Sequence, residues 1–332
     1  MQPARTGPVQ LFLPFGGEGS LSWVIDGAAA QSLGSGAVSL EKSKTPAGIL
    51  VRRVTFEYPD DLDAHWNPAE VEWSQVVNAS SLLMPYLEPF LIQAVREAIP
   101  RITDPALVEE AKGYVGQEAQ HFRQHRKFNE LIINGGYERL REYEATLEAD
   151  YEKIRRERDP DFCLAYAAGF ETMALAVGHM LVRYRTKFFK GADPAVSSLV
   201  LWHFVEELEH KHAAFGIYQH VVGSYRLRVK ALGYTMFHTL RRTRQAYIML
   251  LQVDGRWGRL RTRWELKKLM FRIFGYLTPW MLEAAMPWHR PERFRDPSWV
   301  TDWAYLYDRG DPGLTELDTD HIEALPSVMG RR

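Results

Sequence analysis

The stretch Trp-His-Phe-Val-Glu-Glu-Leu-Glu-His, residues 202–210, decides how this chain can fold. It contains Glu207 and His210 in a Glu-x-x-His spacing, which places a carboxylate and an imidazole on one face of a helix. His203 lies on the same stripe, one turn before Glu207. The other positions of that stripe are apolar: Leu199, Val200, Ala214 and Ile217. Because an apolar stripe faces a core, we expect these three polar side chains to be buried together.

A second Glu-x-x-His pair occurs at Glu118 and His121. Its stripe continues through Tyr114, His125, Phe128 and Ile132. The spacing alone is weak evidence, since Glu209 and His212 form a third pair. That third pair lies on another face, beside Lys211, and we expect it to face solvent. The stripes therefore select the first two pairs.

Two other helical segments each carry one carboxylate on an apolar stripe. Glu171 has small and apolar neighbours at helical spacing: Ala167, Ala168, Ala174, Leu175 and Gly178. Glu88 has the same kind of surroundings, namely Met84, Leu91, Ile92 and Val95. Both carboxylates are therefore expected to point inward.

The helix that carries Glu88 also contains Pro85 and Pro89. Proline removes a backbone hydrogen bond and can kink or break a helix. If the break displaces Glu88 from the core, Glu97 or Glu72 would take its place.

Four inward carboxylates with no Lys or Arg on their stripes need compensation, because a buried unpaired carboxylate costs several kcal/mol. In di-metal carboxylate bundles, two helices each give Glu-x-x-His and two others each give one Glu. Carboxylates can bridge two cations, and neutral imidazoles suit iron. The sequence therefore predicts a two-metal centre with Glu88, Glu118, His121, Glu171, Glu207 and His210 as ligands. Core carboxylates held by salt bridges are the alternative.

Three phrases carry a family resemblance: Ser-Leu-Leu-Met-Pro at 81–85, Gln-Glu-Ala-Gln-His at 117–121, and residues 202–210. Over about residues 50 to 290 the chain resembles the bacterial ferritin-like family catalogued as predicted metal-dependent hydrolases. The resemblance implies a ferritin-like fold and a di-metal site more directly than it implies hydrolysis.

The order of the ligands is also similar to that of di-iron arylamine N-oxygenases. In those enzymes one iron has an additional histidine from the last ligand helix, which implies that His203 is a seventh ligand. The alternative is that His203 contacts a ligand without binding metal. We expect His125, Tyr114 and Glu206 to contact the ligands in this way.

The fold class that we predict is all-α: a ferritin-like four-helix bundle with a charged connecting helix and additional C-terminal helices. The expected helices cover residues 69–99, 105–133, 137–157, 160–190 and 194–222, followed by others in 225–290. We divide the chain into a loosely ordered extension (1–48), the di-metal bundle (49–224), a basic and aromatic helical region packed on the bundle (225–290), and an irregular tail (291–332). Residues 49–56 look strand-like.

Charge is distributed unevenly along the chain. The net charge is −1, which gives no sign of nucleic-acid binding, yet residues 225–272 contain thirteen Lys or Arg and only two acids. This local excess of eleven positive charges suits an anionic membrane surface or an anionic ligand. The alternative is that these arginines pair with the acidic connecting helix.

The single cysteine, Cys163, excludes an intrachain disulfide and favours a reducing cytoplasm; we expect it to be a buried core thiol. No uncharged apolar stretch of about 18 residues occurs. We therefore expect a cytoplasmic protein, in contact with a membrane at most through its periphery.

The function that we predict is a di-iron enzyme that activates O2 to oxidise or oxygenate a small apolar or amphipathic substrate. It would need two iron ions and an electron donor, and it would form a homodimer. A metal-dependent hydrolase is the first alternative, with manganese or zinc in place of iron. A non-catalytic metal-binding protein is the second.

Overall fold

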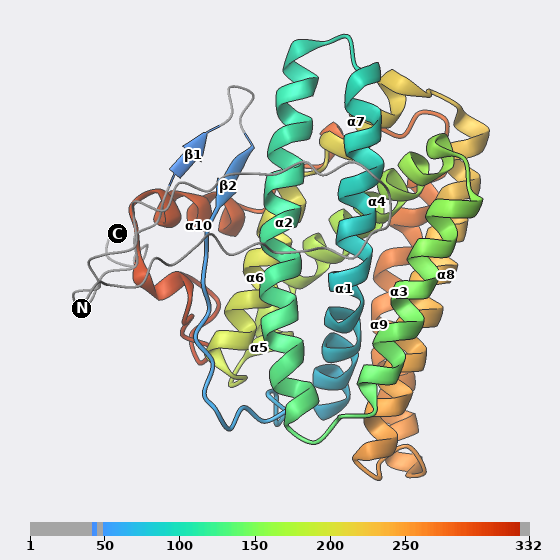
Figure 1. The fold of residues 1–332 in the computed structure, drawn as a ribbon. Helices are drawn as coiled ribbons and strands as arrows, with labels where there is room; N and C mark the ends of the chain where they lie inside the picture. The colour runs from blue at the N-terminus through green and yellow to red at the C-terminus, as the bar shows by residue number, and fades with distance from the viewer. Residues whose placement is uncertain (1–41, 45–48, 326–332) are drawn as a thin grey trace, which may run out of the picture. The chain divides into compact units, whose positions relative to one another are not determined.

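The computed structural model describes residues 42–44 and 49–325. Its helices are α1 (Val71–Ala98), α2 (Pro105–Asn134), α3 (Leu140–Glu157), α4 (Pro160–Arg183), α5 (Arg185–Phe189), α6 (Pro194–Glu209), α7 (Ala213–Val221), α8 (Tyr225–Val253), α9 (Leu260–Ala284) and α10 (Ser298–Asp308) (Figure 1). Strands β1 (Lys42–Lys44) and β2 (Leu50–Arg52) form one antiparallel pair. The all-α fold class is therefore confirmed.

Three of the bundle helices begin in the same way. Asp104, Asp159 and Asp193 each precede a proline and cap α2, α4 and α6 respectively. Each aspartate accepts a hydrogen bond from a free backbone N–H of the first turn, at 2.8 to 2.9 Å. Proline needs no hydrogen bond at the first helical position, so Asp-Pro fixes where each helix starts.

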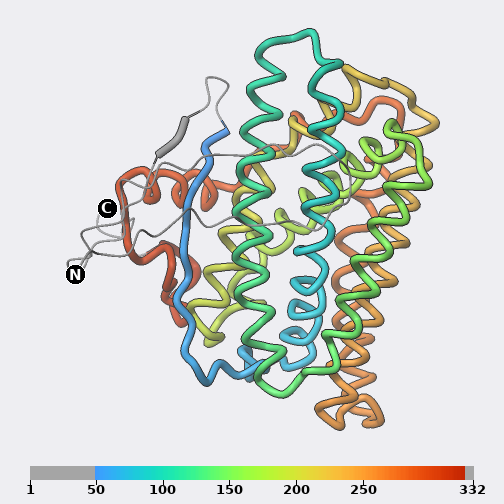
Figure 2. Tube along the Cα trace, in the orientation of Figure 1, coloured from blue at the N-terminus to red at the C-terminus, as the bar shows by residue number. Residues whose placement is uncertain are grey.

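Helices α1, α2, α4 and α6 form a bundle. Helix α1 packs along α2 and also contacts α4, while α6 packs on α4 and contacts α2. The charged helix α3 connects α2 to α4 across the bundle, and α8 covers α1 and α4 (Figures 1 and 2). Helix α4 is long and apolar enough to span a membrane, but 94% of its most apolar window is buried inside the protein. It is the central helix of this bundle.

The expected interruption of the first helix is wrong. Helix α1 runs unbroken through Pro85 and Pro89. Pro85 cannot donate to the carbonyl of Ser81, one turn earlier. The side chain of Asn129 on α2 donates to that carbonyl instead, at 2.9 Å. A neighbouring helix thus replaces the lost bond, and Glu88 stays in register.

Two expected helices are divided in the structure. The segment 160–190 forms α4 and α5, and the segment 194–222 forms α6 and α7 with a turn at residues 210–212. Side chains of this turn pair with the C-terminal segment, Lys211 with Asp296 at 2.7 Å and His212 with Glu292 at 3.5 Å. The second helix break therefore lies where the chain contacts its tail.

The ends of the chain differ from the expectation where they are described. The tail expected to be irregular contains α10 and two short 3-10 turns. Trp303 and Tyr307 of α10 pack against the Arg52 guanidinium, at 5.6 and 5.3 Å from their ring centres. Of the expected N-terminal extension, residues 1–41 and 45–48 lie outside the described residues.

Candidate metal centre

All seven predicted ligands lie together in the core of the bundle. Each is at most 3% exposed. They come from all four bundle helices: Glu88 from α1, Glu118 and His121 from α2, Glu171 from α4, His203 and Glu207 from α6, and His210 from the turn after α6.

The seven side chains form overlapping groups whose donor atoms lie within 4.8 Å of one another. One group contains Glu118, Glu171, Glu207 and His210, and a second contains Glu88, Glu118 and His121. A third contains His121, His203 and Glu207, and His125 joins Glu88 and His203 in a fourth. Glu118 and Glu207 are the two members of the first group that recur in another group, so they link it to the rest.

The donor atoms face one another without hydrogen bonds. Among the described residues, both carboxylate oxygens of Glu88, Glu118 and Glu207 are buried with no hydrogen-bond partner. The same holds for Oε2 of Glu171 and for Nδ1 of His121 and His210. Buried polar atoms are almost always paired, so such a concentration of unpaired ones indicates a missing partner.

The pKa shifts of the carboxylates also indicate that a positively charged partner is missing. Burial, with the nearby charge of Glu207, raises the pKa of Glu171 to about 8. Burial and Glu118 raise the pKa of Glu88 well above its ordinary value. Without a cation these two carboxylates are therefore driven toward the neutral form. Two divalent cations would compensate them, and carboxylate oxygens with imidazole nitrogens suit iron, manganese or zinc.

Residues outside the seven ligands orient His121 by hydrogen bonds, which we call the outer contacts. Its Nε2 lies 3.0 Å from Glu206 Oε2, and Glu206 Oε1 accepts from Arg52 at 3.1 Å. Because Glu206 is an acceptor, Nε2 of His121 carries the proton and donates it. Nδ1 is therefore the ring nitrogen that faces the carboxylates, with Glu118 Oε1 at 3.5 Å.

His210 is oriented in the same way, but by an amide. Its Nε2 lies 2.7 Å from Gln117 Oε1. The Gln117 amide donates to the Leu50 carbonyl at 2.8 Å, which fixes Oε1 as its acceptor end. His210 must then donate through Nε2, and its Nδ1 is 3.1 Å from Glu118 Oε1 and 3.5 Å from Glu171 Oε2.

A chain of hydrogen bonds also sets the protonation of His203. Asn129 donates to the Ser81 carbonyl, so its Oδ1 accepts from the Ser81 hydroxyl, at 2.6 Å. Ser81 Oγ must then accept from Nδ1 of His125 at 2.8 Å, which leaves Nε2 of His125 as an acceptor. That atom accepts from Nδ1 of His203 at 3.0 Å. The lone pair of His203 Nε2 consequently faces the carboxylates, 3.1 Å from Glu207 Oε1.

The remaining predicted contacts are also at the centre. The Tyr114 hydroxyl donates to Glu171 Oε1 at 2.8 Å, while His125 and Glu206 contact His203 and His121 as described above.

The expectation that Glu209 faces solvent is wrong. Its side chain is only 27% exposed, and its carboxylate accepts from Arg52 at 2.7 Å and from Gln117 at 3.0 Å. It is part of the outer contacts because Arg52, which lies 157 residues earlier in the chain, packs against that face of the helix.

The sequence reasoning missed Arg52, Gln117, Ser81 and Asn129. Two of them had a visible signal, since Gln117 directly precedes Glu118 and Ser81 lies one turn before Pro85. Arg52 had none, because its contacts depend on how the strand docks on α2 and α6.

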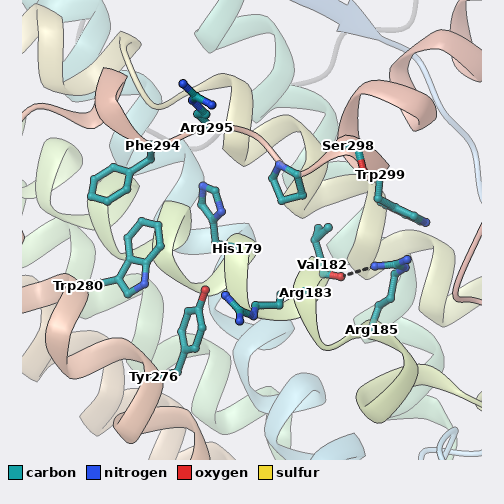
Figure 3. A pocket seen from close by; sticks show the side chains of 11 residues that line it. His179, Val182, Arg183, Arg185, Tyr276, Trp280, Phe294, Arg295, Ser298 and Trp299 are labelled. Atoms are coloured by element: carbon teal, nitrogen blue, oxygen red, sulfur yellow. Dashed lines mark hydrogen bonds between the residues drawn. The ribbon is translucent and has the colours of Figure 1, made fainter.

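A separate cavity of about 520 Å³ lies between α4, α9 and the segment after α9 (Figure 3). Trp280 and Phe294 stack in its wall with ring centres 4.3 Å apart, next to His179. Its lining includes Arg183, Arg185 and Arg295 but none of the seven predicted ligands. The cavity is therefore not the metal centre.

The chain was compared with known proteins. A family model described as "predicted metal-dependent hydrolase" matches residues 50–294. The match runs from β2 to beyond α9, so it includes every residue of the centre and confirms the resemblance drawn from the sequence. No curated protein and no solved structure matches the chain. The chain belongs to the family of predicted metal-dependent hydrolases.

Proposed function

We propose that the protein is a di-iron enzyme that uses O2 to oxidise or oxygenate a small apolar or amphipathic substrate. The observation that supports this proposal is the set of buried, unpaired oxygen and nitrogen atoms that four helices direct at one another. An arrangement of four glutamates with two or three histidines is the donor set of di-iron carboxylate bundles. We also infer a ferritin-like bundle from this ligand order.

The overlapping groups suggest a division of the ligands into two positions. Glu118 and Glu207 would be shared. Glu88, His121 and His203 would complete the first position. Glu171 and His210 would complete the second. His203 is proposed as a ligand because its hydrogen-bond chain leaves Nε2 unprotonated and directed at Glu207.

Iron would supply the oxidising chemistry, and the protein's own residues would hold and shape the site. Arg52, Glu206 and Gln117 fix His121 and His210. Tyr114 holds one oxygen of Glu171, which leaves the other free. The surrounding stripes are apolar and buried, so they exclude water from the ligands.

The proposed reaction requires a reductant. Transfer of one oxygen atom from O2 to a substrate releases the other atom as water, and this consumes two electrons and two protons. We therefore propose an external electron donor as a partner, besides O2 and the small-molecule substrate.

Hydrolysis is the second candidate, because the family's own description names it. The donor set would also accept zinc or manganese, which suit that reaction. A metal site without catalytic activity would have the same ligands and no turnover.

Metal content and O2 consumption separate these functions. The protein should be purified after expression with iron, and its metals should be counted by elemental analysis. We expect about two iron ions per chain and O2 consumption by the reduced protein that depends on iron. Stoichiometric zinc that supports cleavage of ester or amide substrates, with no O2 consumption by the iron form, would replace the proposal by hydrolysis. Two bound ions with neither activity would indicate a non-catalytic site.

A further inference from the structure

Helix α9 carries an exposed apolar row on its outer face. Leu260 and Phe271 are 83% and 82% exposed, and Trp264 and Leu282 are 61% and 59% exposed. Their spacings of four, seven and eleven residues place all four on one stripe of the helix. We call this stripe the α9 row.

The opposite face of α9 is also apolar, but it is buried. Leu266, Leu269, Leu277 and Met281 are at most 7% exposed, and the helix packs on α4 and α1. The contacts of the bundle thus account for one face of α9 only. Of the large apolar side chains that are exposed in residues 49–325, all but Tyr184 and Tyr305 lie between Tyr225 and Trp288.

Cations alternate with the α9 row. Arg261, Arg263, Lys267 and Lys268 are all exposed and lie within the two turns that surround Trp264. The one acid between positions 260 and 282 is Glu265, and it pairs with Lys268 at 2.5 Å. In the described part of the chain, Arg261, Arg263 and Lys267 form no ion pair with a carboxylate, although Arg263 donates to the Trp257 carbonyl.

Internal pairing accounts for other cations of this region but not for these. Arg242 of α8 pairs with Asp150 of the acidic helix α3. Arg272, on the flank of α9, pairs with Glu70 at 3.3 Å. The expected pairing with the connecting helix is therefore found for Arg242 of α8, and the α9 row retains an uncompensated positive charge.

We propose that the α9 row docks on the surface of a membrane that contains anionic lipids. A helix that lies in a bilayer interface combines leucine and aromatic side chains with flanking lysine and arginine. Tryptophan prefers the headgroup level, and nearby cations attract anionic lipids. The α9 row and its flanking cations provide these apolar, aromatic and basic side chains on one face of α9. The helix packs on the bundle through its other face. This proposal does not depend on the identity of the bound metal.

A second copy of the chain is the main competing occupant. A two-fold dimer would bring the same patch of both subunits together. The interface would then contain Arg261, Arg263 and Lys267 of both copies, and like charges gathered in this way oppose association. A negatively charged lipid surface is the complementary partner.

Vesicle binding by the full-length protein tests the proposal. The protein should sediment with phosphatidylcholine vesicles that contain phosphatidylserine and remain largely unbound with pure phosphatidylcholine. Phe271→Ser should weaken this binding about tenfold, since a buried phenylalanine contributes roughly that much. Phe237→Ser is the matched control, because Phe237 is an exposed phenylalanine that lies on α8, outside the α9 row, and its loss should change binding less than about twofold.

The charge requirement needs its own pair of variants. Replacing Arg261, Arg263 and Lys267 together by Gln should abolish the preference for phosphatidylserine. Replacing the exposed Arg139, Arg156 and Lys187 by Gln removes the same net charge elsewhere on the protein. This control variant should keep the preference for phosphatidylserine.

Three results would overturn the proposal. The first is that the wild-type protein does not bind phosphatidylserine vesicles. The second is that the two members of either variant pair lose binding equally. The third is a dimer, seen by light scattering, that Phe271→Ser dissociates. Metal content, measured in parallel, should be unchanged in every variant, so a failure here is distinct from a failure of the proposed di-iron function.

Discussion

The two halves of the candidate metal centre have the same sequence pattern and different surroundings. Each half has a single glutamate followed by Glu-x-x-His, first on α1 and α2, then on α4 and α6. In the first half, His121 donates to the carboxylate of Glu206, which Arg52 also contacts. In the second half, His210 donates to the neutral amide of Gln117.

The halves also differ in their number of histidines. His203 faces the group that contains His121, while the group of Glu118, Glu171, Glu207 and His210 has one histidine. An anionic acceptor makes an imidazole a stronger donor to a metal than a neutral acceptor does. The comparison teaches that a symmetric ligand pattern need not give two equivalent metal positions. We expect the position near His121 to bind its ion more tightly.

The largest expected effect tests whether the two positions share ligands. Glu118→Ala should remove both ions, because Glu118 lies in groups on both sides of the centre. Glu171→Ala should mainly remove the ion near His210, so that metal content falls from about two per chain to about one. Elemental analysis measures both.

Glu209→Ala is the control for these variants, because Glu209 lies beside the centre without belonging to any ligand group. It should keep more metal than Glu171→Ala. Equal losses in these two variants would mean that the face of α6 that carries Glu209 also takes part in metal binding.

A smaller effect is expected from the outer contact that distinguishes the halves. Glu206→Gln gives His121 a neutral amide acceptor like that of His210. Affinity for the first ion should fall toward that of the second, by about tenfold at the lower end of the range for such contacts. Competition with a chelator measures the two affinities. Glu209→Gln is the matched control, since Glu209 also pairs with Arg52 but contacts neither histidine. If both variants lose the same affinity for the first ion, the affinity depends on the pairing with Arg52 and not on the charge of the group that accepts from His121.

The smallest change in metal content is expected from His203→Ala. Six ligands remain, and water can fill the space that the imidazole leaves. Metal content should fall only partly, while X-ray absorption should count one nitrogen fewer at the site. His212→Ala, which alters a half-buried histidine just beyond the same helix that pairs with Glu292, should leave the nitrogen count unchanged. A crystal structure of the metal-loaded protein with the residue 203 imidazole well beyond about 2.5 Å from either ion would refute its role as a ligand.

The helices were largely predictable, because their signals are local. The Asp-Pro starts of α2, α4 and α6 can be read from adjacent residues, and the inward stripes follow from helical spacing. The unbroken α1 could not be predicted, because the bond lost at Pro85 is replaced by Asn129, 44 positions along the chain from Pro85.

Long-range contacts limited the prediction of the site in the same way. Burial of the seven inward side chains follows from their stripes, but the position of Glu209 depends on Arg52, which lies in a separate strand. Which outer residue contacts which histidine could be established only from the packed structure. The division at residues 210–212 likewise coincides with contacts to a distant tail segment.

The long sequence separation between Arg52 and its partner Glu206 has a consequence for how the site forms. The guanidinium is synthesised early, and its partner Glu206 follows 154 residues later. Closing so long a loop is entropically costly and comes after local helices have formed. A growing chain on the ribosome can therefore present its first Glu-x-x-His long before the histidine acceptors are in place. Stable metal loading should therefore require that synthesis has passed His210, the last of the seven ligands.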